Sequence, residues 1–176
     1  MKKSIFLTLF FISLFATSQN LQPIINNYGK TFTVKNADLL LNTNKTYKVI
    51  FDVYTDSNSP KKINKHIETV ARFLNMHAAQ GVPKENMKIA LVLHGKATKN
   101  TLNNEYYLKE YKTNNPNLNL MDSLQKAGVE IFVCGQSFEA YDYKRKHLAT
   151  SVQLSLSALT ALVEYQSNGY QIINFN

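Results

Sequence analysis

Short apolar runs alternate with amphipathic stretches along most of the chain. Runs rich in β-branched and aromatic residues occupy 47–54, 87–93 and 129–134, and their length and composition predict strands. The run 87–93 is almost continuously apolar, so both of its faces are expected to be covered. Two shorter runs, at 149–154 and 170–175, predict a brief fourth strand and a last strand.

Between these runs, apolar residues recur at three- and four-residue intervals, which predicts helices. The clearest stripe spans 63–78 and stops at Gly81, and the preceding Ser59 and Pro60 suit an N-cap and a first helical position. Other helical stretches are predicted at 118–127, directly after Cys134, and from 156 to 168, with looser helical spacing at 106–111. The tyrosines of this last stretch fit either the core or a subunit contact, and the choice stays open: Tyr106, Tyr107 and Tyr111.

Strands that alternate with helices predict an α/β fold. Each pair of parallel strands needs a crossover connection, so we expect three layers, with a mainly parallel sheet and helices on both of its faces. No repeat or low-complexity linker divides the chain, and we assign one α/β domain to 46–176. A lead-in at 19–45 mixes Asn and Lys with apolar residues and is expected to be partly ordered, with a short strand.

The first 18 residues have the pattern of a signal peptide. Lys2 and Lys3 precede an apolar run from Ile5 to Phe15, and Ala16 and Ser18 put small residues where a signal peptidase cleaves. The run is too short to span a bilayer, and no cysteine follows it for lipid attachment. The protein is therefore expected to be exported, periplasmic or secreted, with no membrane association after cleavage.

Charge argues against a nucleic-acid partner. The chain has 20 Lys and Arg against 12 Asp and Glu, a net charge of +8, and two of the positive charges lie in the signal peptide. The other basic residues are scattered along the chain, whereas nucleic-acid binders group them with interleaved aromatic residues. We interpret them as solvated surface.

Cys134 is the single cysteine, so no intramolecular disulfide can form. It lies at the carboxyl end of a predicted strand and just before a predicted helix, where ligands of parallel sheets bind and where helix dipoles stabilise a thiolate. This position makes it a candidate nucleophile or sulfur carrier. The alternative is a small buried side chain that completes a strand, because free cysteine is among the most buried residue types. Both interpretations remain open.

Other polar residues at strand ends have alternatives as well. His94 is a candidate to orient or deprotonate the thiol or to bind a charged group, or it is hydrogen-bonded structure. Asp52 either points into the strand-end crevice or forms a structural pair, which we favour. His66, His77 and His147 fit no metal spacing with Cys134, so neither a metal nor another cofactor is expected.

Motifs for nucleotide binding and serine hydrolysis are missing. The sequence at Gly95 and Lys96 ends like a P-loop, but Ala90 and Ala97 stand where that motif needs glycine and a hydroxyl. No dinucleotide-binding glycine motif or nucleophile elbow occurs, and the segment 54–60 has no glycine that would let a phosphate approach the backbone.

Four segments, in this order, resemble the DsrE/DsrF-like family: 47–52, 91–95, 128–137 and 169–170. The most specific is Gly-Val-x-Ile-x-Val-Cys-Gly-Gln-Ser at 128–137, and the resemblance covers roughly 46–175. It implies a small three-layer α/β domain that assembles as a homotrimer or homohexamer. Relatives relay sulfur as a cysteine persulfide, and Cys134 matches the position of that cysteine.

The resemblance favours a sulfur carrier or transfer protein that exchanges sulfur with donor or acceptor proteins. Transfer-RNA thiolation is not expected of an exported chain. Cys134 would carry the sulfur, and the residues expected to stabilise its anion are His94, Gly95, Gly135, Gln136 and Ser137. The alternative is a non-catalytic oligomeric module that binds a ligand or partner, with Cys134 as core packing.

Overall fold

A computed structural model describes residues 22–175, so the signal peptide expected at 1–18 lies outside the described residues. Five parallel strands form one sheet in the order β4-β3-β2-β1-β5. The bounds of the strands are β1 (Tyr47–Val53), β2 (Met87–Leu93), β3 (Glu130–Cys134), β4 (Gln153–Ser155) and β5 (Gln171–Asn174).

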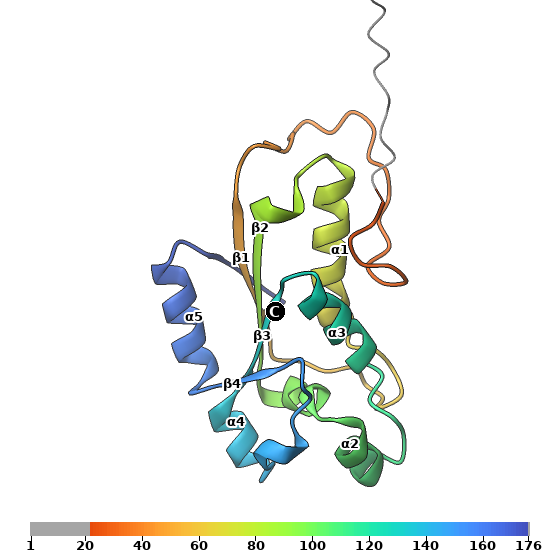
Figure 1. Ribbon diagram of the computed structural model, residues 1–176, viewed down its shortest axis with the longest axis vertical. Coiled ribbons are helices and arrows are strands. Elements are labelled where there is room, and N and C mark those ends of the chain that lie inside the picture. Colours follow the sequence, from red (N-terminus) through yellow and green to blue (C-terminus); the bar gives the residue numbers. More distant parts are fainter. Residues whose placement is uncertain (1–21, 176) are drawn as a thin grey trace, which may run out of the picture.

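Helices cover both faces of this sheet, so the molecule has three layers (Figure 1). Helices α1 (Lys65–Ala79) and α3 (Leu118–Lys126) pack on one face, and α5 (Ala158–Ser167) packs on the other. Within residues 22–175, no helix has the length and apolar character that crossing a bilayer requires. The predicted three-layer α/β fold with a parallel sheet is confirmed.

Shorter helical segments join these elements. Helices α2 (Asn104–Tyr111) and α4 (Gly135–Ala140) lie at the end of the sheet towards which the strands run, at the bottom of Figure 1. Three 3₁₀ turns complete the connections: η1 (Lys84–Asn86), η2 (Gly95–Thr101) and η3 (Arg145–His147).

Alternation along the strands divides the core in two. Phe51 and Val53 of β1 point into the larger core beneath α1 and α3, whereas Ile50 lies in a smaller cluster beneath α5. Cys134 belongs to the smaller cluster, whose members are Ile50, Ala90, Val92, Cys134, Ala158 and Ala161. The last residue of β3 therefore faces α5, and Asp52, two positions after Ile50, belongs to the same face of the sheet.

Two predicted boundaries are wrong. Helix α1 is capped by Asn64 rather than Ser59, because the Asn64 side-chain oxygen accepts the His66 N–H at 3.0 Å. Ser59 instead closes a turn, with the Lys62 N–H 3.2 Å from its carbonyl oxygen. Strand β4 begins later than the expected 149, because the chain from Ala149 to Val152 forms a hydrogen-bonded turn.

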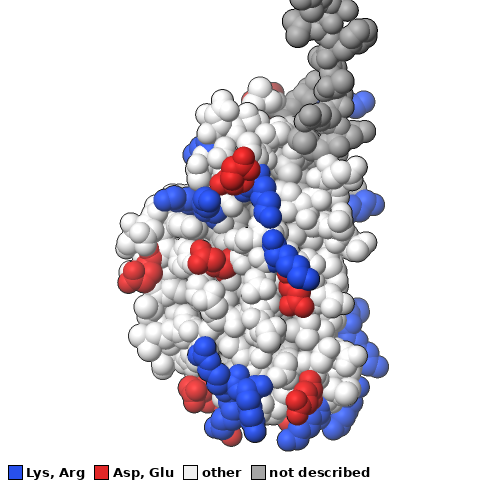
Figure 2. Space-filling model, viewed as in Figure 1, with Lys and Arg blue, Asp and Glu red and all other residues white. Residues whose placement is uncertain are grey.

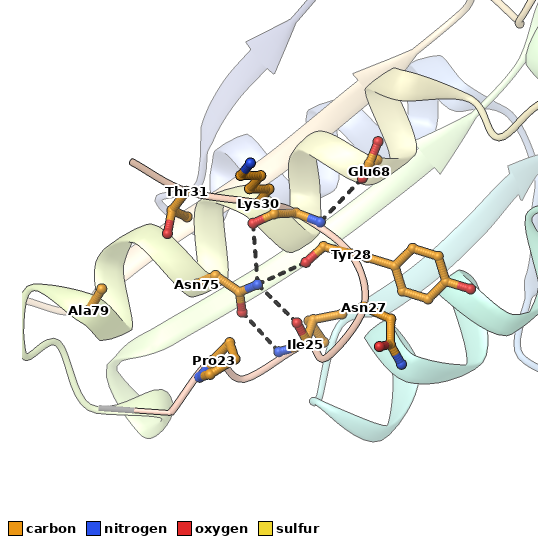
Figure 3. Close-up of a pocket in the computed structure, with 10 residues that line it drawn as sticks. Pro23, Ile25, Asn27, Tyr28, Lys30, Thr31, Glu68, Asn75 and Ala79 are labelled. Atoms are coloured by element: carbon orange, nitrogen blue, oxygen red, sulfur yellow. Dashed lines mark hydrogen bonds between the residues drawn. The ribbon is translucent and has the colours of Figure 1, made fainter. Parts of the chain in front are cut away.

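The expected short strand is absent from residues 22–46. This part of the chain is held by Asn75 of α1, which is 6 % exposed (Figure 3). The Asn75 side chain accepts the Ile25 N–H at 2.8 Å and donates to the carbonyl oxygens of Ile25 and Tyr28 at 2.9 and 3.0 Å. Gly29 has a φ of +65° and lies against the Arg72 backbone. Side-chain hydrogen bonds thus replace a strand ladder.

Tyr107 lies in the core. It is 1 % exposed, and its hydroxyl donates to the Pro60 carbonyl oxygen at 3.0 Å. Tyr106 and Tyr111 are half-buried against the same core. The structure therefore favours the core interpretation of these tyrosines.

Candidate functional site

Polar side chains meet at the carboxyl ends of three neighbouring strands, as expected. Asp52 is the second-last residue of β1, His94 directly follows β2, and Cys134 is the last residue of β3. Leu93 and Val133 are partners in the parallel register, so His94 and Cys134 each come one residue later on adjacent strands. The fold thus gathers these residues at one edge of the sheet.

The His94 side chain is paired with a carboxylate. Its Nε2 lies 2.8 Å from Oδ1 of Asp52, and its ring meets that of Tyr54 edge-on, with centroids 5.2 Å apart. This contact bears out the structural pairing favoured for Asp52. Among the described residues, no hydrogen bond joins His94 to Cys134, so in this conformation His94 does not act on the thiol directly.

The Cys134 sulfur has a hydrogen-bond donor at the start of α4. Cys134 caps α4, and its sulfur accepts the Ser137 N–H at 3.5 Å. Burial of the residue, which is 5 % exposed, raises the pKa of the thiol, but hydrogen bonds outweigh that effect and the pKa is lowered. The groups that lower the pKa of the thiol are the Ser137 hydroxyl and the N–H groups of Ser137, Ala158 and Gln136. The site therefore favours the thiolate.

Ser137 connects the loop after β2 with the loop after β3. Its hydroxyl oxygen accepts the Gly95 N–H at 3.2 Å, while its backbone N–H donates to the Cys134 sulfur at 3.5 Å. These two bonds join the His-Gly and Cys-Gly-Gln-Ser segments, which both belong to the family resemblance. A Cβ added at Gly95 would collide with the Tyr54 ring.

Gly135 allows α4 to approach the turn that leads into α5. A Cβ at this position would lie 2.5 Å from the Ser155 carbonyl oxygen and 3.0 Å from that of Leu156. Since both are backbone atoms, they cannot move aside as a flexible side chain would. The missing side chain of Gly135 thus lets the start of α5 come close to Cys134.

Sequence reasoning missed the contribution of α5. Ser157 caps this helix, with its hydroxyl oxygen 2.9 Å from the Thr160 nitrogen. The next residue, Ala158, packs in one cluster with Cys134, and its N–H group helps to lower the pKa of the thiol. The available signal was a serine directly before an apolar helical stripe at a strand end. The expected helix start at 156 concealed it.

Gln136 was also expected at the site. Gln136 contributes its backbone N–H, whereas its side chain belongs to an exposed residue. Within residues 22–175, no three His, Cys, Asp or Glu side chains come together as a metal site. The arrangement suits a nucleophilic sulfur whose negative charge is stabilised by N–H and O–H donors.

Comparison with known proteins gives a family and a fold. The model of the DsrE/DsrF-like family matches residues 48–175, and no curated protein matches the chain. Two solved structures are similar, each over 73 % of this chain and 99 % of the other chain. They are a protein of unknown function, MTH1491, from Methanobacterium thermoautotrophicum (18 % identity, TM-score 0.55) and the ychN protein from E. coli (13 % identity, TM-score 0.51). At these identities the structures support the fold alone.

Proposed function

The chain belongs to the DsrE/DsrF-like family, and from this membership and the surroundings of Cys134 we propose that the protein carries sulfur on Cys134 as a persulfide. The observation that carries the proposal is that the Cys134 sulfur accepts the Ser137 N–H at 3.5 Å where β3 meets α4, and the lowered pKa of the thiol agrees with it. A cysteine that only fills space has no need of such donors.

The proposed step needs no external oxidant. The Cys134 thiolate attacks the outer sulfur of a donor persulfide, so an S–S bond forms on Cys134 while the donor's S–S bond breaks. The electron pair of the broken bond leaves with the donor, which departs as a thiolate. Transfer to an acceptor thiolate reverses these roles. The donors around Cys134 stabilise the negative sulfur before attack and again when it leaves.

His94 has a supporting role in this proposal. Its ring is held between Asp52 and Tyr54, and the peptide that follows it supplies the Gly95 N–H to Ser137. His94 therefore fixes the loop that orients the Ser137 hydroxyl. Because Ser137 and backbone N–H groups supply the hydrogen bonds to the sulfur, we assign stabilisation of the anion to them.

Mass spectrometry of the intact protein tests the proposal. Incubation with a small persulfide donor, followed by removal of excess donor, is expected to add the mass of one sulfur atom to the wild-type protein and to the matched control Ser123→Ala. Cys134→Ser is expected to add none. A wild-type protein that acquires no sulfur, or a Cys134→Ser variant that still acquires it, contradicts the proposal.

A second candidate function is favoured by burial. Cys134 packs with apolar side chains and is 5 % exposed, which suits a ligand- or partner-binding module in which the cysteine is core packing. In that case Cys134→Ala leaves assembly and ligand binding unchanged, and the wild-type protein takes up no sulfur.

We also propose that the protein forms a homo-oligomer, a trimer or hexamer, through the outer face of α5. Leu156, Leu159 and Val163 are 72, 76 and 60 % exposed, and their spacing puts Leu159 and Val163 on one helical stripe. Light scattering after size exclusion is expected to show an oligomer for wild type and a smaller species for Leu159→Glu. A monomeric wild-type protein refutes this arrangement.

Export is proposed from the leader sequence. Expression of the full chain in a bacterium is expected to yield a periplasmic or secreted product whose N-terminus is Gln19. A product that keeps Met1 and stays in the cytoplasm contradicts this proposal.

A further inference from the structure

The strand order reverses between β1 and β5. The chain proceeds from β1 through β2 and β3 to β4 in one direction and then returns past β1 to β5. In open parallel sheets, ligands bind beyond the carboxyl ends of the strands at such a reversal. Cys134 ends β3, which is separated from β1 by β2, so the reversal lies apart from the sulfur site.

A cavity of about 670 Å³ lies on the β1 side of this reversal. We name it the switch-point cavity; its walls are the loop that follows β1 and the first turn of α1, within 56–68. His66, on its wall, stacks on Phe175 directly after β5, with ring centroids 4.5 Å apart and an interplanar angle of 12°. The volume of the switch-point cavity falls within the range of small-molecule sites, about 300 to 1,000 Å³.

Three lysines line the switch-point cavity: Lys61, Lys62 and Lys65. None of them belongs to the ion pairs formed by the described residues. Figure 2 shows Lys and Arg side chains at the lower end of the molecule, where the strands end in Figure 1, with Asp and Glu side chains between them. The cavity itself is thus lined by three cations that form no ion pair within the described residues.

The two acidic side chains of the cavity are engaged elsewhere. Asp56 lies 2.6 Å from Lys99 Nζ and accepts from Asn100 Nδ2 at 2.8 Å. Glu68 accepts the Gly29 N–H at 3.3 Å. The charge of Asp56 is therefore compensated by Lys99, whereas Glu68 keeps its negative charge. Three lysines against this one carboxylate leave the cavity with a net positive charge.

The loop that carries the lysines is braced from inside. Asn64, which is 2 % exposed, donates from Nδ2 to the Thr55 carbonyl oxygen at 2.8 Å, and its own N–H donates to Asn117 Oδ1 at 2.8 Å. The Ser57 hydroxyl bonds to the carbonyl oxygens of Ser59 and Lys62 at 2.7 and 3.0 Å. A braced loop loses little conformational entropy when it binds a ligand.

His66 adds a directed polar group. Its Nδ1 lies 2.9 Å from Thr55 Oγ1, and stacking on Phe175 fixes the plane of the ring. Since Nδ1 has a partner, Nε2 is the ring nitrogen available to a ligand in the cavity.

We propose that the switch-point cavity binds a small ligand that carries a phosphate- or sulfate-type oxyanion, held by Lys61, Lys62 and Lys65, with His66 as a further contact. The segment 54–60 contains no glycine, so charged side chains take the part that backbone N–H groups play in glycine-loop phosphate sites. This site is independent of the sulfur chemistry of Cys134.

Nuclear magnetic resonance titration at constant ionic strength tests the site. The protein is the Cys134→Ser variant, so the result does not depend on the proposed sulfur function, and the probes are inorganic phosphate, pyrophosphate and sulfate. We expect saturable shifts of the backbone amides of 61–66 with at least one probe. The probe that binds most tightly distinguishes a phosphate-type from a sulfate-type ligand.

Matched lysine variants separate the site from general surface charge. The variant Lys61→Gln, Lys62→Gln, Lys65→Gln is expected to weaken binding about tenfold or more. The control Lys84→Gln, Lys88→Gln, Lys126→Gln removes the same charge from exposed positions near the opposite ends of the strands and is expected to change binding less than twofold. The proposal is overturned if no probe gives saturable shifts at 61–66, or if both triple variants weaken binding equally.

Discussion

Replacement of Gly135 by alanine probes the contact that brings α5 to Cys134. The new Cβ would lie 2.5 Å from the Ser155 carbonyl oxygen, whereas carbon–oxygen contacts normally begin at about 3.3 Å. The turn that leads into α5 must therefore retreat by roughly 0.8 Å, taking the Ala158 N–H away from the sulfur. One substitution is expected to affect both stability and the thiol.

The size of the stability change follows from two opposing effects. Overpacking against backbone costs about 1 to 3 kcal/mol, because these atoms cannot rotate away. Alanine recovers up to about 1 kcal/mol through its better helix propensity and the smaller entropy of the unfolded chain. The steric effect wins, and the free energy of unfolding is expected to fall by about 1 to 2 kcal/mol.

Urea denaturation measures the stability change, and the pH dependence of alkylation measures the pKa of Cys134. Gly169→Ala is the matched control: a Cβ there meets nothing within 4 Å, but the φ of +83° makes alanine cost about 1 to 2 kcal/mol. Both variants are expected to lose stability, and Gly135→Ala alone to raise the pKa of Cys134. If Gly135→Ala keeps the wild-type stability and the wild-type thiol pKa, the close approach of Gly135 to Ser155 is refuted.

Three further predictions concern the Cys134 thiol and the packing of residues 22–46. Ser137→Ala is expected to raise the pKa of Cys134 in an alkylation profile, because the hydroxyl donor is lost; an unchanged profile would show that this hydroxyl does not reach the sulfur. Because the pKa of Cys134 is lowered by folding, the unfolded chain binds more protons than the folded chain between that pKa and about 8.5. The stability of wild type relative to Cys134→Ser should therefore increase as the pH rises through this window. A stability difference in urea denaturation that stays constant with pH would argue against this linkage. Asn75→Ala is expected to cost about 2 kcal/mol and to expose residues 22–46 to limited proteolysis, whereas the neighbouring exposed Met76→Ala should do neither; equal cleavage of both variants would contradict the role of Asn75.

Periodicity was enough to predict the sheet and its layers. The apolar runs that became β1, β2 and β3 have a strand's length, and the stripe of α1 has a helix's period, so local sequence and tertiary packing agree. The start of α1 was missed because Asn64 is held in place by Asn117, which lies far along the sequence and whose side-chain oxygen accepts the Asn64 N–H. A pattern of neighbouring residues cannot show such a contact.

The candidate site was predicted only in part, for the same reason. Cys134, Gly95 and Ser137 could be named because the segments around them carry a family resemblance, and hydrogen bonds join them in the structure. The donor from α5 could not, because Ala158 reaches the sulfur only through the close approach at Gly135. Asp52 and His94 were each named, but their bond depends on side-chain direction at a strand end.

Titration of the Cys134 thiol tests the central claim most directly, since the proposed function depends on a sulfur held as thiolate. The rate of alkylation by iodoacetamide is measured from pH 5 to 10 on folded wild-type protein, with Cys134→Ser as the blank. The midpoint of this rate profile is expected to lie below the ordinary pKa of the cysteine, taken as the midpoint measured on the same protein unfolded in urea. A midpoint at or above that value would contradict the claim that Ser137 and the nearby N–H groups stabilise the thiolate.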